Sequence, residues 1–106
     1  NTIMTNEETE TAEDILETIR KDRAERIERL LETIADLNPE TPVLEGLDDC
    51  IEGYDKDGRI IYSVHNIIET LMERDEMSEE EAWEHYSFNI EGSYLGEYTP
   101  IFLYHE

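Results

Sequence analysis

The sequence predicts an α+β fold: a long N-terminal helix, a β-hairpin, two further helices and a C-terminal strand (α-β-β-α-α-β). Three observations predict it. A helical apolar pattern fills residues 11–38, an Asp-Gly pair separates two short β-rich segments, and an apolar run follows Pro100. The three strands can form one sheet covered by a helical layer. We expect residues 1–10 to be disordered and residues 39–106 to form the compact domain.

The long helix has clear end signals. Thr11 followed by Asp14 fits a capping box, and Asn38 with Pro39 stops the helix. Its apolar residues form two stripes: Ala12, Ile15, Leu16 and Ile19, then Ile27, Leu30, Leu31, Ile34 and Leu37. At ~1.5 Å per residue the helix is about 40 Å long, which is more than the domain needs. It either bends over its own core, projects as an arm, or pairs with a second copy, parallel or antiparallel, as a homodimer.

The segments "CIEGY" and "RIIYS" read as the two strands of a hairpin, and Asp57-Gly58 reads as its turn. The same residues resemble the middle of a calcium-binding EF-hand loop. With Gly58 at position six, however, positions one and twelve are Gly53 and Val64, and neither can supply the anchoring carboxylate. Cys50 and the three histidines lack the close spacing of zinc ligands. We therefore expect a structural turn, no metal and no cofactor.

Two shorter helices follow the hairpin. Ser63 can cap the first, whose apolar face is Val64, Ile67, Ile68, Leu71 and Met72. The second begins at Ser78, which Glu81 answers as a capping box, and Gly92 suits a left-handed exit. Trp83, Tyr86 and Ile90 have the spacing of one buried helical face.

The link to the last strand has its own turn residues. Asn89 can hydrogen-bond to backbone beyond the helix end, Gly92 and Gly96 permit positive φ, and Pro100 opens the strand. The strand carries Ile101 and Leu103 on one face and Phe102 and Tyr104 on the other. We therefore expect it to be central or covered on both faces, and place it beside "CIEGY".

Two segments after Gly53 have a distinctive wording: "LMERDEM", residues 71–77, and above all "FNIEGSYLGEYTPIF", residues 88–102. In these segments the chain resembles a small family of uncharacterised proteins found in bacteria, archaea and their viruses. The resemblance covers roughly the C-terminal half, and the N-terminal helix lies outside it. The family has no assigned biochemical activity, so the resemblance implies a fold and no catalytic residue.

The charge is strongly negative. Twenty-nine acidic residues face eight basic ones, for a net charge of −21. Residues 40–106 hold 18 acidic and 3 basic groups, which gives −15 for the compact domain. Such a charge disfavours direct binding to nucleic acid or to anionic membranes and favours a basic protein partner. It also predicts that added salt stabilises the fold by screening self-repulsion.

The remaining patterns narrow the class of protein. The single Cys50 excludes an internal disulfide, and the chain has no apolar run of membrane length and no signal-peptide pattern, so we expect a cytoplasmic protein. It also lacks a nucleophile elbow, a phosphate loop and a dinucleotide fingerprint, so we expect no enzyme.

The expected function is an acidic protein-binding module, in its sharpest form a nucleic-acid mimic that inhibits a host DNA-binding or defence protein. The alternative is a stand-alone domain from a halophile, whose acidity is an adaptation to solvent; a small enzyme with an unrecognised site is a third. The candidate partner-binding residues are acidic or aromatic and lie in the last quarter of the chain: Glu79, Glu80, Trp83, Glu84, Glu91, Tyr94, Glu97 and Tyr98.

Overall fold

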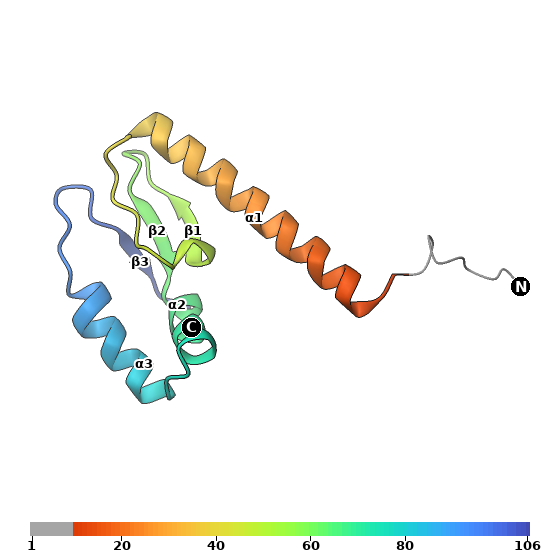
Figure 1. The fold of residues 1–106 in the computed structure, drawn as a ribbon. Coiled ribbons are helices and arrows are strands. Elements are labelled where there is room, and N and C mark those ends of the chain that lie inside the picture. The colour runs from red at the N-terminus through yellow and green to blue at the C-terminus, as the bar shows by residue number, and fades with distance from the viewer. Residues whose placement is uncertain (1–9) are drawn as a thin grey trace, which may run out of the picture.

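The computed structural model describes residues 10–106, and its elements follow the predicted order (Figure 1). They are α1 (Ala12–Leu37), a 3₁₀ turn (Asp48–Cys50), β1 (Ile51–Tyr54), β2 (Ile60–Ser63), α2 (Val64–Arg74), α3 (Glu79–His85), a π-helix (Tyr86–Glu91) and β3 (Ile101–Leu103). The fold class is thus confirmed. Residues 1–9 of the predicted disordered segment lie outside the described part.

The strand order differs from the one expected. The sheet has the order β1-β2-β3, in which β1 is antiparallel to β2 and β3 is parallel to β2. The expected pairing of β3 with β1 is therefore wrong. Ser63, the last residue of β2, caps α2, so the chain leaves β2 directly into the helical layer. It returns through α2 and α3, and such a helical crossover joins parallel strands.

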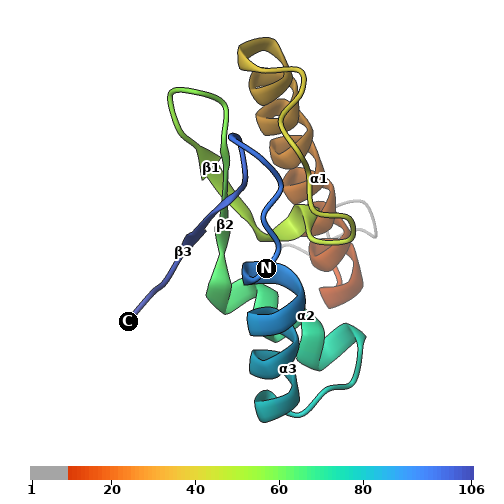
Figure 2. The same ribbon diagram turned by 90° about the vertical axis from the view of Figure 1, so that its left-hand side faces the viewer.

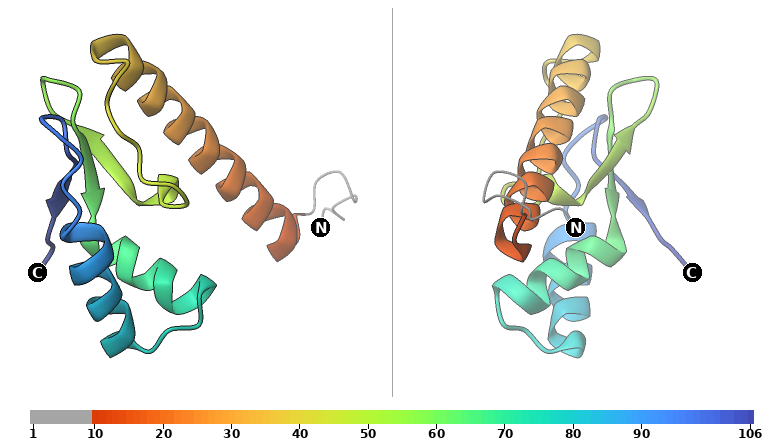
Figure 3. Two further views of the ribbon diagram at one scale, coloured as in Figure 1. Left: turned by 60° about the vertical axis from the view of Figure 1, so that its left-hand side comes forward. Right: turned by 90° about the vertical axis from the view of Figure 1, so that its right-hand side faces the viewer.

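All three α-helices lie on one side of the sheet, as Figures 2 and 3 show. On the covered face Ile60 and Tyr62 are fully buried, and the Phe102 ring stacks against Tyr62 with centroids 6.3 Å apart. On the other face Leu103 stays 42% exposed. The expectation of a central or doubly covered last strand is therefore wrong: β3 is an edge strand, and only its Phe102 face packs against helices.

The core lies between the sheet and the helices. Four of the five residues predicted for the apolar face of α2 are buried, and Met72 is exposed. Residues of α1, the 3₁₀ turn, the sheet and the α3 region complete the core. Its buried residues are Ile27, Ile34, Leu47, Cys50, Ile51, Ile60, Tyr62, Val64, Ile67, Ile68, Leu71, Ala82, Tyr86 and Ile90.

The hairpin turn is confirmed at Asp57-Gly58. Gly58 has φ of +82°, and its N–H donates to the carbonyl of Asp55 at 3.0 Å. The Asp55 carboxylate accepts the N–H groups of Asp57 and Arg59, both at 2.9 Å. A tight turn ending in a left-handed glycine is typical of a three-residue hairpin loop. The Asp55 carboxylate is thus already used to hold the loop.

Only the second half of α1 packs on the domain. Ile27 and Ile34 are buried, whereas Ile15, Leu16 and Ile19 are 46%, 49% and 46% exposed. The predicted capping box between Thr11 and Asp14 is present, so the exposed half begins at a well-formed helix end. Residues 12–23, called the arm from here on, project from the domain (Figure 1). Of the three alternatives for this helix, the one in which it bends over its own core is therefore excluded.

Candidate functional site

The start of α3 displays a cluster of carboxylates. The Ser78 hydroxyl accepts the N–H of Glu81 at 3.2 Å, and the Glu81 carboxylate accepts the N–H of Ser78 at 3.1 Å. This predicted capping box is confirmed, and its hydrogen bonds hold the pKa of Glu81 below the usual range. Glu79, Glu80 and Glu84 point no carboxylate at a basic side chain within 4 Å in the described part of the chain. Their charge is available to a partner.

A hollow of about 330 Å³ lies beside this cluster. Glu81, Glu84 and His85 line it from α3, together with Phe88, Asn89 and Met77. The Phe88 side chain is 76% exposed, so its ring forms an open wall rather than part of the core. Carboxylates and an exposed aromatic ring in one hollow provide both parts of an arginine site: an ion-pair partner and a stacking surface.

Phe88 is the residue that the sequence prediction missed. It lies in the π-helix two residues after buried Tyr86 and two before buried Ile90. A step of two residues along a helix turns to the opposite side, so the spacing from Tyr86 and Ile90 contained the signal. The predicted set contains the aromatic residues Trp83, Tyr94 and Tyr98 but not Phe88. Short π-helical turns of this kind are frequent at functional sites.

Two of the predicted candidates, Glu91 and Trp83, are exposed but also contact the domain through a hydrogen bond or a ring contact. The Tyr104 hydroxyl donates to the Glu91 carboxylate, and the hydroxyls of Tyr104 and Tyr86 lie 2.7 Å apart. Trp83 is 40% exposed, but its ring meets the ring of Tyr86 edge to face with centroids 5.9 Å apart. The expected burial of Trp83 beside Tyr86 and Ile90 is thus only partial.

The loop between the π-helix and β3 presents the second group of candidates. Tyr94 is 77% exposed, and Glu97 and Tyr98 lie in a turn in which the N–H of Thr99 donates to the carbonyl of Gly96 at 3.1 Å. Arg59 beside the hairpin turn fixes this loop, because its Nε donates to the Thr99 carbonyl at 2.9 Å. As predicted, Gly96 has positive φ, at +99°.

Two structural predictions in this region are wrong. Gly92 has φ of −71°, because the π-helical turn carries the right-handed backbone through it. Glycine is needed there for space instead: a Cβ would lie 3.0 Å from the carbonyl oxygen of Ser87. The Asn89 side chain pairs with Nδ1 of His85 at 3.2 Å rather than with backbone beyond the helix. Pro100 directly precedes β3, as expected.

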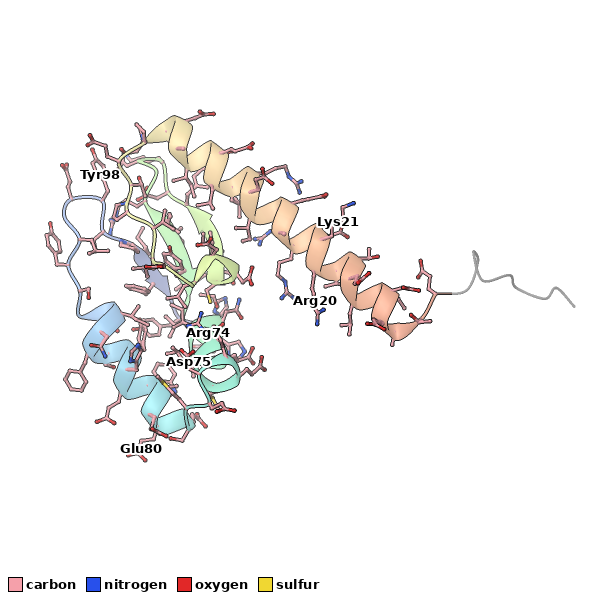
Figure 4. All side chains as sticks on the ribbon, viewed as in Figure 1. Arg20, Lys21, Arg74, Asp75, Glu80 and Tyr98 are labelled. Carbon is pink, nitrogen blue, oxygen red and sulfur yellow. The ribbon has the colours of Figure 1, made fainter. Side chains whose placement is uncertain are left out.

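The predicted candidates follow one another along the chain, from the start of α3 to the loop before β3. Figure 4 shows Glu80 at the start of α3 and Tyr98 near the opposite end of the domain. We call this the acidic aromatic surface: Glu79, Glu80, Trp83, Glu84, Phe88, Glu91, Tyr94, Glu97 and Tyr98. It is a continuous stretch of chain rather than a closed pocket, which suits a protein partner better than a small molecule.

A separate cleft of about 500 Å³ lies between α1, the 3₁₀ turn and α2. Three of the eight Lys and Arg residues of the chain line it: Arg23, Arg26 and Arg74. Arg26 donates to the carbonyl of Glu52 at 3.3 Å, and Arg74 donates to the carbonyl of Gly46 at 2.6 Å and pairs with Asp75. The cleft also contains carboxylates, so it is not a strong anion site by itself.

Reactive and metal-binding groups are poorly placed for chemistry. Cys50 is buried, and burial raises the pKa of its thiol, which keeps it protonated and unreactive. Among residues 10–106, no three His, Cys, Asp or Glu side chains are grouped so as to hold a metal ion.

Comparisons of the chain with family models, curated proteins and solved structures found no match. None of the helices in the described residues is long and apolar enough to cross a membrane.

Proposed function

We propose that this chain is a non-enzymatic protein-binding module whose acidic aromatic surface binds a basic, arginine-containing segment of a partner. One observation carries the proposal: Phe88 and Tyr94 are 76% and 77% exposed, and Phe88 shares its hollow with Glu81 and Glu84. Exposed rings are costly in water, and aromatic residues are enriched where interfaces gain most of their affinity.

The charge around these rings is uncompensated. Residues 75–106 contain nine acidic residues and no Lys or Arg: Asp75, Glu76, Glu79, Glu80, Glu81, Glu84, Glu91, Glu97 and Glu106. A partner arginine can stack on the Phe88 ring while its guanidinium pairs with Glu84, because both residues line the same hollow. A lysine has no planar group to stack in this way. The surface therefore favours arginine over lysine.

The more specific form of the proposal is a nucleic-acid mimic that occupies the basic groove of a DNA-binding or defence protein. The net charge of −15 on residues 40–106 supports it, because the negative field belongs to the folded domain and steers a basic partner toward it. In this form the partner's nucleic acid and this chain compete for one site.

A second candidate function is a stand-alone domain whose acidity is an adaptation to a salty solvent. It is favoured by the spread of exposed carboxylates over every part of the domain, for example Glu32 on α1, Glu45 in the connector, Asp57 at the hairpin and Glu73 on α2. Solvent adaptation accounts for carboxylates but gives no reason for Phe88 and Tyr94 to be exposed.

A binding assay with variants that keep the net charge of the chain separates the protein-binding function from solvent adaptation. Fluorescence anisotropy measures affinity for a labelled Arg-Gly repeat peptide and for the matched Lys-Gly peptide. We expect tighter binding of the arginine peptide, and a loss of about fivefold in Phe88→Ala. Tyr54→Ala, which removes an exposed tyrosine from β1, is the control and should bind as the parent does. Equal affinity of all three proteins for both peptides would mean generic charge attraction and would favour solvent adaptation.

The mimicry form is tested by capture from a host lysate with the parent chain and with Phe88→Ala/Tyr94→Ala, which has the same net charge. The relevant proteins are those retained by the parent and lost by the double variant. Mimicry predicts that they bind duplex DNA and that DNA displaces them from the chain. Retention of the same proteins by both baits, or no displacement by DNA, would contradict mimicry.

A further inference from the structure

We propose that the arm pairs with the arm of a second copy in antiparallel orientation, so that the chain forms a homodimer. The starting observation is an apolar stripe without a partner. Ile15, Leu16 and Ile19 are about half exposed on a helix that projects from the domain. This inference concerns a different part of the molecule from the acidic aromatic surface and does not depend on it.

The stripe continues the face by which α1 packs on its own domain. Leu16, Ile19, Ile27 and Ile34 recur at spacings that place them along one side of a helix. Since Ile27 and Ile34 face the core, the arm turns its apolar side toward the open space between the arm and α2 (Figure 1). A second helix lying along the arm would cover this stripe.

The charge pattern of α1 selects another copy of the same helix. Residues 10–17 contain four acidic groups and no basic one: Glu10, Glu13, Asp14 and Glu17. Residues 20–29 contain five basic and three acidic groups, so the helix is negative at its start and positive beyond its middle. Two copies laid antiparallel place the negative start of each beside the positive section of the other.

The apolar layers and the flanking charges agree on one register. In this register Leu16 of each copy lies opposite Ile19 of the other. Ala12 of each copy then lies opposite Arg23 of the other. Glu13 and Arg20 lie seven residues apart on one flank of the stripe. In this register the Glu13 of each copy lies beside the Arg20 of the other, twice per dimer. Figure 4 shows Arg20 on the side of the arm that faces the domain and Lys21 on the outer side.

In this register the start of each helix lies next to the cleft between α1, the 3₁₀ turn and α2 of the other copy. Arg23 and Arg26 line it at the base of the arm, where the acidic first turn of the second copy arrives. The first turn contributes Glu13 and Asp14, and Glu10 lies just before the N-cap residue Thr11. A helix start with these carboxylates complements arginines that otherwise have only partial partners within their own chain.

A parallel pair is disfavoured by the same charges. It would set Arg23 against Arg23 in the apolar seam and hold two domains of net charge −15 side by side. The antiparallel pair keeps the domains at opposite ends of the arms.

Sedimentation equilibrium of the full chain, from low micromolar to near-millimolar concentration, tests the proposal. The interface is short, so we expect a dimer that dissociates on dilution. Arg20→Glu should weaken it about tenfold, since two attractive contacts become repulsive. Lys21→Glu changes the net charge equally on the outer side and is the matched control. Ile19→Glu should leave only monomer. A parent chain that stays monomeric at every concentration would overturn the proposal.

Orientation is tested by two further experiments. The charge swap Glu13→Arg/Arg20→Glu should restore the dimer in the antiparallel arrangement, and circular dichroism checks that the arm remains helical. Ala12→Cys alone should not form a disulfide-linked dimer, whereas a mixture of Ala12→Cys and Arg23→Cys chains should. Rapid linking of Ala12→Cys to itself would show a parallel pair and reject the proposed one.

Discussion

The hydroxyl groups of Tyr86 and Tyr104 lie 2.7 Å apart, although one residue is in the π-helix and the other follows the last strand. Tyr104 donates its only proton to Glu91, so Tyr86 must be the donor between the two tyrosines. This chain of hydrogen bonds holds β3 to the acidic aromatic surface. Burial is the main cause that raises the pKa of Tyr86.

Removal of the middle hydroxyl tests the strength of this link. Tyr104→Phe leaves the buried Tyr86 hydroxyl without its acceptor, and we expect the free energy of unfolding to fall by about 1–2 kcal/mol. Urea denaturation followed by circular dichroism measures it. Tyr94→Phe removes a hydroxyl from a largely exposed ring and should change stability by less than ~0.5 kcal/mol. Equal effects of the two variants would show that the link adds nothing.

Alkaline pH should destabilise the domain through Tyr62. Burial raises the pKa of Tyr62 from 10.0 to about 12, and its hydroxyl accepts the N–H of Leu44 at 2.8 Å. Between these two values the unfolded chain loses the proton and the folded chain keeps it. The stability is therefore complete below pH ~10 and is lost as pH rises toward ~12, by roughly 2 kcal/mol.

The check is a series of urea denaturations from neutral to alkaline pH. Tyr62→Phe loses some stability at neutral pH, since the Leu44 N–H loses its acceptor, but the alkaline decline should be shallower than in the parent. An unchanged slope in Tyr62→Phe would assign the alkaline decline to other groups, Tyr86 and Tyr104 among them.

Local signals in the sequence predicted the elements well. The capping boxes at Thr11 and Ser78 and the cap at Ser63 all depend on residues three positions apart, and all are present. Strand order, in contrast, depends on contacts between residues far apart in the sequence, so these local signals did not predict it. The alternating apolar residues of β3 predict a strand covered on both faces, whereas only the Phe102 face is covered: Tyr86 packs on Phe102, beside Tyr62 of the neighbouring strand.

The same difference between local and tertiary information applies to the acidic aromatic surface. Carboxylates without basic neighbours can be counted along the chain, so the sequence is enough to nominate Glu79, Glu80 and Glu84 as candidates. Whether an aromatic ring is buried depends on which side of a helix meets the sheet. The prediction therefore missed Phe88, and it could not show that Glu91 is tied to Tyr104.

Salt should stabilise the folded chain. Nearly all carboxylates in residues 10–106 are exposed and the net charge of the chain is −21, so added ions screen the repulsion among them. We expect the melting temperature to rise by about 5 °C between low and ~1 M sodium chloride. The variant Glu79→Gln/Glu80→Gln/Glu84→Gln should melt higher at low salt and gain less from added salt. A melting temperature that stays flat or falls would contradict the prediction.

Alanine at three glycines should separate backbone strain from lack of space. Gly58 has φ of +82°, and a Cβ there would lie 3.0 Å from the Cβ of Asn38 at the end of α1. Gly96 has φ of +99° but open space around it, and Gly53 has open space without positive φ. We therefore expect Gly58→Ala to cost about 2–3 kcal/mol, Gly96→Ala about 1 kcal/mol and Gly53→Ala close to zero. Urea denaturation gives all three values. A cost at Gly58 no larger than at Gly96 would mean that the hairpin turn and the end of α1 do not pack closely.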